Sequence, residues 1–334
     1  MSGTASVPKI GIVIIGRNEG PRLRRCLDSL KEYGLQTVYV DSGSTDSSIE
    51  TAKNAGCTVY ELSTSEIFSA GRARNAGFHT LIKKCPQLKY IQFVDGDCIL
   101  DKNWLMTAET YLDNHPDTAI ACGRRREIAP QASVYNMLCD IEWDTAIGDA
   151  KECGGDFMIR RELFELVDGF DPEVIAGEEP ELCFRLRNKG WKIARLNEEM
   201  TIHDAAMYRF GQFAKRSERS GHAYAQAVAM HGQSPEKFQL RQLLSILFWG
   251  AGLPLVIMLT AITINAFVLS ALLIYPLLYL KITYSNLRHR HMKTGTASMY
   301  AFFLVIGKFF QALGALKFMR RYLSSGKYTI IEYK

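Results

Sequence analysis

A long uncharged apolar segment near the carboxyl end constrains this chain more than any other feature of its sequence. Residues Leu243 to Leu280 contain no acidic or basic side chain, and they are nearly twice as long as the roughly 20 residues that span a bilayer as a helix. The polar residues Thr263 and Asn265 near the middle favour a hairpin of two short spans over one long helix. The alternative is a buried helical core.

The basic residues gather after this segment. Residues 281–334 hold ten Lys or Arg and one acid, a local charge of +9, whereas residues 1–280 hold 30 Lys or Arg against 34 Asp or Glu, a charge of −4. The positive-inside rule therefore predicts that both flanks of the hairpin lie in the cytoplasm. The flanking basic residues are Lys237, Arg241, Lys281, Arg288, Arg290 and Lys293.

A second apolar segment, residues 299–318, carries Lys308 and Gln311. This composition favours an amphipathic helix in the plane of the membrane over a third span. We therefore expect four parts. They are a catalytic domain at 1–205, amphipathic interface helices at 206–242, a membrane hairpin at 243–281 and a basic juxtamembrane segment with an amphipathic helix at 282–334.

The cysteines and the amino-terminal segment indicate a cytoplasmic location. The eight cysteines, from Cys26 to Cys183, show no CxxC pair and no zinc-like Cys/His spacing, which is typical of reduced thiols. The first apolar run, Ile10–Ile15, has only the length of a strand, so no secretory signal is expected. We expect the protein at the inner membrane, with its catalytic domain on the cytoplasmic face.

The first two hundred residues alternate strand and helix patterns. Helical patterns at 21–33 and 47–55 separate short apolar runs that are rich in β-branched and aromatic residues. This alternation predicts an α/β fold with a mainly parallel sheet covered on both faces, whose ligands bind beyond the carboxyl ends of the strands. The expected strands are Ile10–Ile15, Thr37–Val40, Thr58–Leu62, Tyr90–Val94, Ala119–Cys122 and Trp191–Leu196.

Polar clusters follow three of these strands. They are Gly16-Arg17-Asn18-Glu19, Asp41-Ser42-Gly43-Ser44-Thr45-Asp46 and Asp95-Gly96-Asp97. Each alone is compatible with a helix-capping Asx turn or a solvated tight turn. Their recurrence at one edge of the sheet favours a binding site. A basic run, Arg124-Arg125-Arg126, lacks an aromatic stacking pattern, so we expect it to bind an acceptor or face solvent and expect no nucleic-acid partner.

An ordered series of six motifs across roughly residues 8–205 resembles the family 2 glycosyltransferases, which use nucleotide-diphospho-sugars and have the glycosyltransferase-A fold. The series is Ile14-Ile15-Gly16-Arg17-Asn18-Glu19, Val40-Asp41-Ser42-Gly43-Ser44-Thr45-Asp46, Gly71-Arg72-Ala73-Arg74-Asn75-Ala76-Gly77, Val94-Asp95-Gly96-Asp97, Gly154-Gly155-Asp156 and Gly177-Glu178-Glu179-Pro180-Glu181.

The resemblance implies a divalent metal site. A hard cation held by carboxylates neutralises a nucleotide diphosphate as it leaves, and Mg²⁺ or Mn²⁺ suits such a site. Asp97 is the expected direct ligand, and Asp95 is expected to bind the ribose or a metal-bound water. His203 matches the place where some relatives add a third ligand, and a hydrogen-bonded interior histidine is the alternative.

The resemblance also implies a donor-binding set. Glu19 and Asp41 resemble positions whose carboxylates accept hydrogen bonds from the base and ribose. Arg72 and Asn75, which lie one helical turn apart, would face the diphosphate or the donor sugar. For that pair the alternative is a solvated helix face. Asp156 is placed at the hydroxyls of the donor sugar. The full set is Arg17, Glu19, Asp41, Arg72, Asn75, Asp95 and Asp156.

Inverting transfer to a hydroxyl needs one general base. The family usually shows Glu-Asp before a helix, with the Asp as base, whereas this chain has Glu178-Glu179. By resemblance the base is Glu179, with Glu178 as the second candidate. Either residue could instead interact with the amino-terminal dipole of the helix expected at Glu181–Asn188.

Cations also lie between the catalytic domain and the hairpin. Relatives that build polysaccharide processively carry a Gln-x-x-Arg-Trp element here, and this chain matches it only in part, with Gln212, Lys215 and Arg216 but no Trp. These side chains are expected to contact the diphosphate or an anionic lipid headgroup. An amphipathic helix resting on the membrane is the alternative.

Together these features predict an inverting glycosyltransferase that moves one sugar from a nucleotide-diphospho-sugar, UDP-sugar favoured, to a lipid-linked acceptor. Membrane lipids would be its other partner, and surface polysaccharide or glycolipid its product. One alternative is a polyprenyl-phosphate glycosyltransferase, whose acceptor needs little help from a base. Another is a catalytically silent membrane protein that binds nucleotide sugars.

Overall fold

The computed structural model describes residues 9–33, 36–63, 65–66 and 68–325. The chain divides into two compact units, one ending at Ala206 and the other beginning at Met207. Each unit is described by itself.

A mixed sheet forms the centre of the first unit, in the strand order β3-β2-β1-β4-β8-β6-β9-β5, with β7 paired to β9. All six strands expected from the sequence are present. The three additional strands have two to four residues, too few to show a hydrophobic pattern. The strands are β1 Ile10–Gly16, β2 Gln36–Asp41, β3 Thr58–Glu61, β4 Tyr90–Asp95, β5 Cys98–Leu100, β6 Thr118–Glu127, β7 Gly148–Asp149, β8 Phe157–Arg160 and β9 Lys192–His203.

The first four strands in space, β3-β2-β1-β4, pair in parallel as expected. Beyond them β8 pairs antiparallel to both β4 and β6, so the sheet is mixed, with most of its paired residues in parallel ladders as expected. In the parallel half, Gly16 lies beside Asp41 and Ile15 beside Asp95. The carboxyl ends of β1, β2 and β4 therefore meet at one edge, which brings two of the predicted polar clusters to either side of the third.

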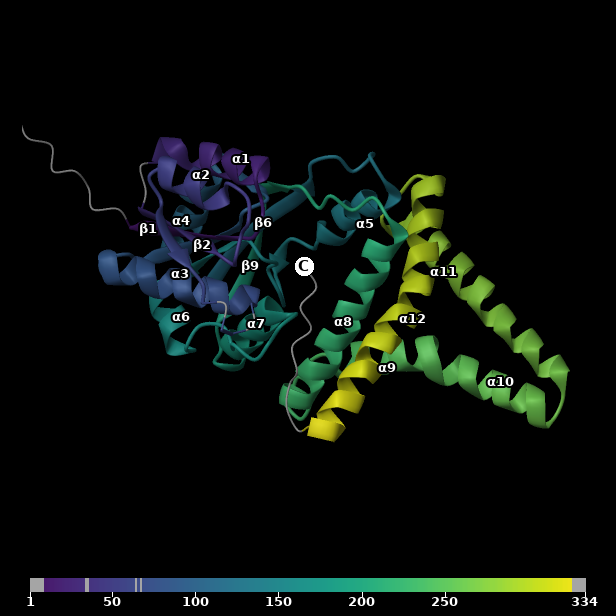
Figure 1. Ribbon diagram of the computed structural model, residues 1–334. Coiled ribbons are helices and arrows are strands. Elements are labelled where there is room, and N and C mark those ends of the chain that lie inside the picture. The colour runs from purple at the N-terminus through teal and green to yellow at the C-terminus, as the bar shows by residue number, and fades with distance from the viewer. Residues whose placement is uncertain (1–8, 34–35, 64, 67, 326–334) are drawn as a thin grey trace, which may run out of the picture. The chain divides into compact units, whose positions relative to one another are not determined.

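Helices cover both faces of this sheet, with α1 and α2 on one side and α3 on the other (Figure 1). The α7 helix begins at Glu178, three residues before the expected start, because Gly177 caps it with a φ of 77°. Both candidate bases therefore lie in its first turn. The helices are α1 Pro21–Leu30 with a 3₁₀ turn at Lys31–Tyr33, α2 Ser48–Asn54, α3 Ala70–Lys84, α4 Trp104–Asn114, α5 Val134–Trp143, α6 Arg161–Leu166 and α7 Glu178–Asn188.

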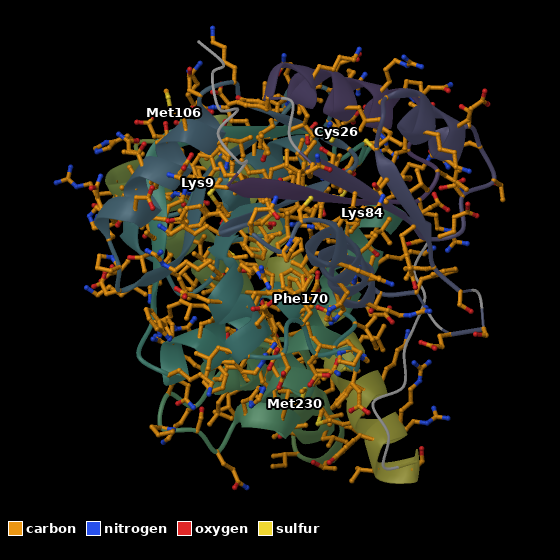
Figure 2. The ribbon with its side chains drawn as sticks, turned by 90° about the vertical axis from the view of Figure 1, so that its left-hand side faces the viewer. Lys9, Cys26, Lys84, Met106, Phe170 and Met230 are labelled. Atoms are coloured by element: carbon orange, nitrogen blue, oxygen red, sulfur yellow. The ribbon has the colours of Figure 1, made fainter. Side chains whose placement is uncertain are left out.

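A cluster of phenylalanine rings packs against the α3 helix. Phe170, labelled in Figure 2, packs edge-to-face on Phe93 with ring centroids 5.7 Å apart. The ring of Phe164 also packs on Phe170, with the two centroids 5.6 Å apart. Such pairs stabilise a core beyond their buried area. Asn75 in α3 holds the backbone of Phe170 through two hydrogen bonds, of 2.7 and 2.9 Å. The second turn of α3 is thereby held against this core.

The second unit is helical. Its α8 and α12 helices pack so closely that two glycines at their contact leave no room for a side chain. A Cβ atom at Gly221 would lie 1.8 Å from the Gln311 carbonyl oxygen, and one at Gly314 would lie 1.9 Å from the Glu218 carbonyl oxygen. Small residues at such crossings let helix backbones approach. The helices are α8 Phe210–His231, α9 Leu240–Leu247, a π-helical turn at Phe248–Gly252, α10 Leu253–Thr263, a 3₁₀ segment at Ala266–Leu273, α11 Ile274–His289 and α12 Thr294–Ser325.

Three helical segments of this unit are long and apolar enough to cross a membrane: Leu240–Thr263, Ala266–His289 and Thr294–Ser324. The first two overlap the hairpin expected at 243–281 and extend beyond it, to Leu240 and His289. Asn265 lies between them and accepts a hydrogen bond from the Phe267 backbone amide. The third is much longer than the expected amphipathic segment at 299–318. By length and composition it is a further candidate span, and the in-plane orientation of this helix stays a prediction.

Candidate active site

The loops after β1 and β2 are joined by hydrogen bonds. The side-chain oxygen of Asn18 accepts a hydrogen bond from the Thr45 backbone amide at 2.7 Å, and the Asn18 backbone amide donates to Ser44 Oγ at 2.8 Å. The buried carboxylate of Asp41 accepts from the amides of Gly43 and Ser44 at 2.9 and 2.7 Å. The second polar cluster thus forms an Asx turn, as the structural alternative predicted, and it also lies at the sheet edge where the binding site was expected.

Asp95 lies between two guanidinium groups. Its Oδ1 accepts from Arg74 at 2.8 Å and its Oδ2 from Arg125 at 3.1 Å. Burial alone would raise the pKa of Asp95, but the charges of Arg74 and Arg125 outweigh burial, and the pKa is lowered. Asp95 is therefore a fixed anion at the end of β4, with both oxygens in ion pairs.

Asp156 holds the turn that carries Asp95. It is fully buried, and it accepts from the Asp95 amide at 2.9 Å, from Thr201 Oγ1 at 2.9 Å and from Cys98 Sγ at 3.2 Å. The resemblance places Asp156 at sugar hydroxyls, but a side chain with no exposed surface and three donors is not open to a sugar. We infer instead that Asp156 positions Asp95.

Gly155 is needed for close approach at this point. A Cβ atom there would lie 2.7 Å from Asp95 Oδ2 and 2.9 Å from Arg74 Nη2. We expect Gly155→Ala to displace the Asp95–Arg74 pair and to lower kcat/KM by about 10- to 100-fold while the protein stays folded. Gly295→Ala, at a position with nothing within 4 Å, is the matched control. Steady-state kinetics with circular dichroism checks this, and unchanged kinetics in Gly155→Ala would contradict the positioning role.

The candidate metal ligands lie together at the same edge. His203 Nε2 at the end of β9 is 3.3 Å from Asp97 Oδ1, a separation that two ligands of one octahedral ion can have. His203 Nδ1 is buried without a hydrogen-bond partner, 4.0 Å from Glu127, and Trp143 packs edge-to-face on the ring at 4.7 Å. The carboxylate of Asp97 suits Mg²⁺ or Mn²⁺, and the imidazole of His203 would be the softer ligand of the pair.

The two adjacent glutamates face different partners. Glu178 Oε1 accepts from Arg74 at 2.9 Å, so one guanidinium links it to Asp95. Glu179 Oε1 accepts from the Cys153 amide and from Cys183 Sγ. Burial, with a further contribution from the charge of Glu152, raises the pKa of Glu179 to about 7. Glu178 is thus an ion-paired carboxylate, whereas Glu179 exchanges a proton near neutral pH.

The other expected donor residues have partners within the protein. Glu19 is buried and forms a 2.7 Å ion pair with Arg22, and Arg17 lies over the Phe68 ring at 5.2 Å. Arg72 donates to the carbonyl oxygens of Ser63 and Glu66. The side chain of Asn75 forms hydrogen bonds with the backbone of Phe170. Of this set only Asp41, Glu19 and Arg17 lie at the ends of β1 and β2.

The three residues of the second unit that were expected to contact a diphosphate or a lipid headgroup lie on α8. Gln212 Oε1 accepts from the amides of Tyr208 and Arg209 at 2.9 Å, so its carbonyl group caps the helix. Lys215 is exposed and Arg216 is half-buried. Contact of these three residues with a diphosphate or lipid headgroup stays a prediction.

Sequence reasoning missed Arg74 and Arg125 as site residues. Arg125 was expected at the acceptor or in solvent, but it contacts Asp95 and lies over the Trp143 ring at 5.0 Å, while Arg126 pairs with Glu199 at the surface. The sequence contained part of the information needed to find these two arginines. Residues alternate sides along a strand, so adjacent arginines on β6 must face different environments. Arg74 lies between small residues of its motif, which is compatible with a buried helix face.

The fold of the first unit is of the glycosyltransferase-A type. Residues 11–165 match the family model of glycosyl transferase family 2. It is 24% identical over 213 residues to the O-antigen chain rhamnosyltransferase RfbN of Salmonella typhimurium, a match that covers 58% of this chain and 66% of that protein.

A solved structure supports the fold. The mannosyltransferase PcManGT from Pyrobaculum calidifontis, in complex with GDP-Man and Mn²⁺, aligns with a TM-score of 0.61 and 17% sequence identity. The alignment covers 92% of this chain and 88% of that one. At this identity the likeness concerns the fold.

Proposed function

We propose that this protein is an inverting glycosyltransferase that moves one sugar from a nucleotide-diphospho-sugar to a lipid-linked acceptor, at the cytoplasmic face of a membrane, in surface polysaccharide or glycolipid synthesis. The observation that carries the proposal is the meeting of Asp41, Asp95, Asp97 and His203 at one sheet edge in a family 2 domain. The named activities of RfbN and PcManGT, transfer of rhamnose and of mannose, support sugar transfer in this chain.

Each residue has a part in the proposed reaction. Asp97 and His203 would hold Mg²⁺ or Mn²⁺, which when bound neutralises the departing diphosphate. Arg74 and Arg125 fix Asp95 for the ribose or a metal-bound water. Glu179 would take the proton of the acceptor hydroxyl, because a base works best with a pKa near the operating pH.

The membrane segments support a lipid-linked acceptor. Three helices of sufficient length and apolar character follow the catalytic unit, with basic residues on both flanks of the first two. We propose UDP-sugar as the donor class. Because PcManGT is bound to GDP-Man, guanosine and thymidine diphospho-sugars belong in the same test.

The test is release of nucleoside diphosphate by the full chain in detergent, with Mn²⁺, a panel of nucleotide sugars and a bacterial lipid extract. We expect release that requires both the metal and the lipid. Donor binding measured by calorimetry, with no turnover across acceptor pools, would instead support a silent nucleotide-sugar binding protein.

A further inference from the structure

Two thiols and one carboxylate form a compact cluster beside α7. The Sγ atoms of Cys153 and Cys183 are 3.5 Å apart, and Cys183 Sγ is 3.3 Å from Glu179 Oε1. All three ligand atoms lie within 4.8 Å of one another. Cys183 follows Glu179 by one helical turn, and Cys153 comes from the segment between β7 and β8. This cluster is separate from the Asp97–His203 pair.

The spacing fits a tetrahedral zinc ion. With zinc–sulfur bonds of about 2.3 Å and zinc–oxygen bonds of about 2.0 Å, tetrahedral angles place two sulfurs about 3.8 Å apart and a sulfur about 3.5 Å from an oxygen. The observed separations are 3.5 and 3.3 Å. Thiolates select zinc over Mg²⁺ or Mn²⁺, which prefer oxygen ligands. We propose that Cys153, Glu179 and Cys183 bind a zinc ion, with water in the fourth position.

The charge balance and the surroundings permit this site. Each thiol loses its proton to solvent as its sulfur–zinc bond forms. The Glu179 carboxyl, whose pKa burial raises to about 7, likewise binds only after its proton has gone to solvent. The three ligands then carry a charge of −3, and the ion leaves a net charge of −1. Burial raises the pKa of both thiols, and the positive charge of Arg187 lowers that of Cys183 in part. Cys153 is half-buried and gives an ion access from solvent, whereas Glu179 and Cys183 are buried.

Zinc at this site would regulate turnover. It would occupy the carboxylate that takes the acceptor proton, so zinc would be a reversible inhibitor. This consequence rests on the proposed function, because it requires Glu179 to be the base. The binding of zinc does not rest on it.

Cobalt spectroscopy tests the binding. Full-length protein in detergent with saturating Mg²⁺ is titrated with Co²⁺, which replaces zinc and gives a thiolate-to-cobalt charge-transfer absorption. We expect this band in the native sequence, its displacement by Zn²⁺, and cobalt affinity weakened about tenfold or more in Cys153→Ala. Cys57→Ala, which removes another half-buried thiol, is the matched control and should keep the band. Cys183→Ser, which conserves volume, provides a second variant that should weaken it.

A band of equal strength in Cys153→Ala, or none in the native sequence, would overturn the site. So would a Cys153–Cys183 disulfide in place of two titratable thiols after purification without reductant. An activity assay separates the two proposals. Zinc should inhibit diphosphate release in the native sequence about tenfold more than in Cys153→Ala. If the cobalt band is present and zinc leaves turnover unchanged, the zinc site stands and Glu179 is not the base.

Discussion

Asp97→Ala should abolish measurable sugar transfer, with kcat lowered about 10³-fold or more, because metal stabilisation of the leaving diphosphate is worth several kcal/mol. Asp97 lies 3.3 Å from His203 and is only slightly exposed, in the turn that follows β4. The side chain fills no large core volume, so the loss should come from chemistry rather than unfolding. Diphosphate release with Mn²⁺ measures the effect.

The matched control for this variant is Asp113→Ala. Asp113 ends α4 in exposed ion pairs with Lys9 and Lys89, and such pairs are worth about 0–1 kcal/mol. Asp113→Ala should keep near-normal turnover. Manganese binding, followed by electron paramagnetic resonance, should be lost in Asp97→Ala and kept in Asp113→Ala. Full activity in Asp97→Ala would remove the metal assignment.

Glu179→Gln should lower kcat about 10²- to 10⁴-fold while donor binding is retained, because the amide keeps the shape of the side chain but cannot accept a proton. Calorimetry with the nucleotide sugar measures donor binding, and single-turnover kinetics measures the transfer step. Near-normal turnover would favour a polyprenyl-phosphate acceptor, which is already nucleophilic.

Glu178→Gln is the companion variant, since Glu178 precedes Glu179 and contacts Arg74 at 2.9 Å. We expect it to disturb the position of Asp95 and to weaken donor binding more than the transfer step. The reverse pattern, with transfer lost in Glu178→Gln and kept in Glu179→Gln, would move the base to Glu178.

The pH profile provides an independent measurement of the same base. Burial raises the pKa of Glu179 to about 7, so the carboxyl is protonated and inactive below that pH. The acid limb of kcat/KM should fall about tenfold per pH unit below neutrality, and it should be absent in the residual activity of Glu179→Gln. An acid limb near the ordinary pKa of glutamic acid would contradict the assignment.

Local patterns in the sequence were sufficient for much of the fold. Six strands, the helices between them and the apolar carboxyl-terminal segments follow from periodicity and run length, which each segment carries by itself. Strands of two to four residues, such as β7 and β8, carry no such pattern. The antiparallel insertion of β8 between β4 and β6 therefore could not be predicted.

The sequence by itself also determined that Asp41, Asp95 and Asp97 gather at one edge, because the carboxyl ends of neighbouring parallel strands must coincide. Only the tertiary structure decided their partners. Asp95 meets Arg74 and Arg125, and Asp156 turns inward. Cys153 meets Cys183 from 30 residues away, at a spacing that resembles no linear metal motif. The physical reason is that burial and charge pairing depend on side chains brought together by packing, whose distances local chain patterns do not encode.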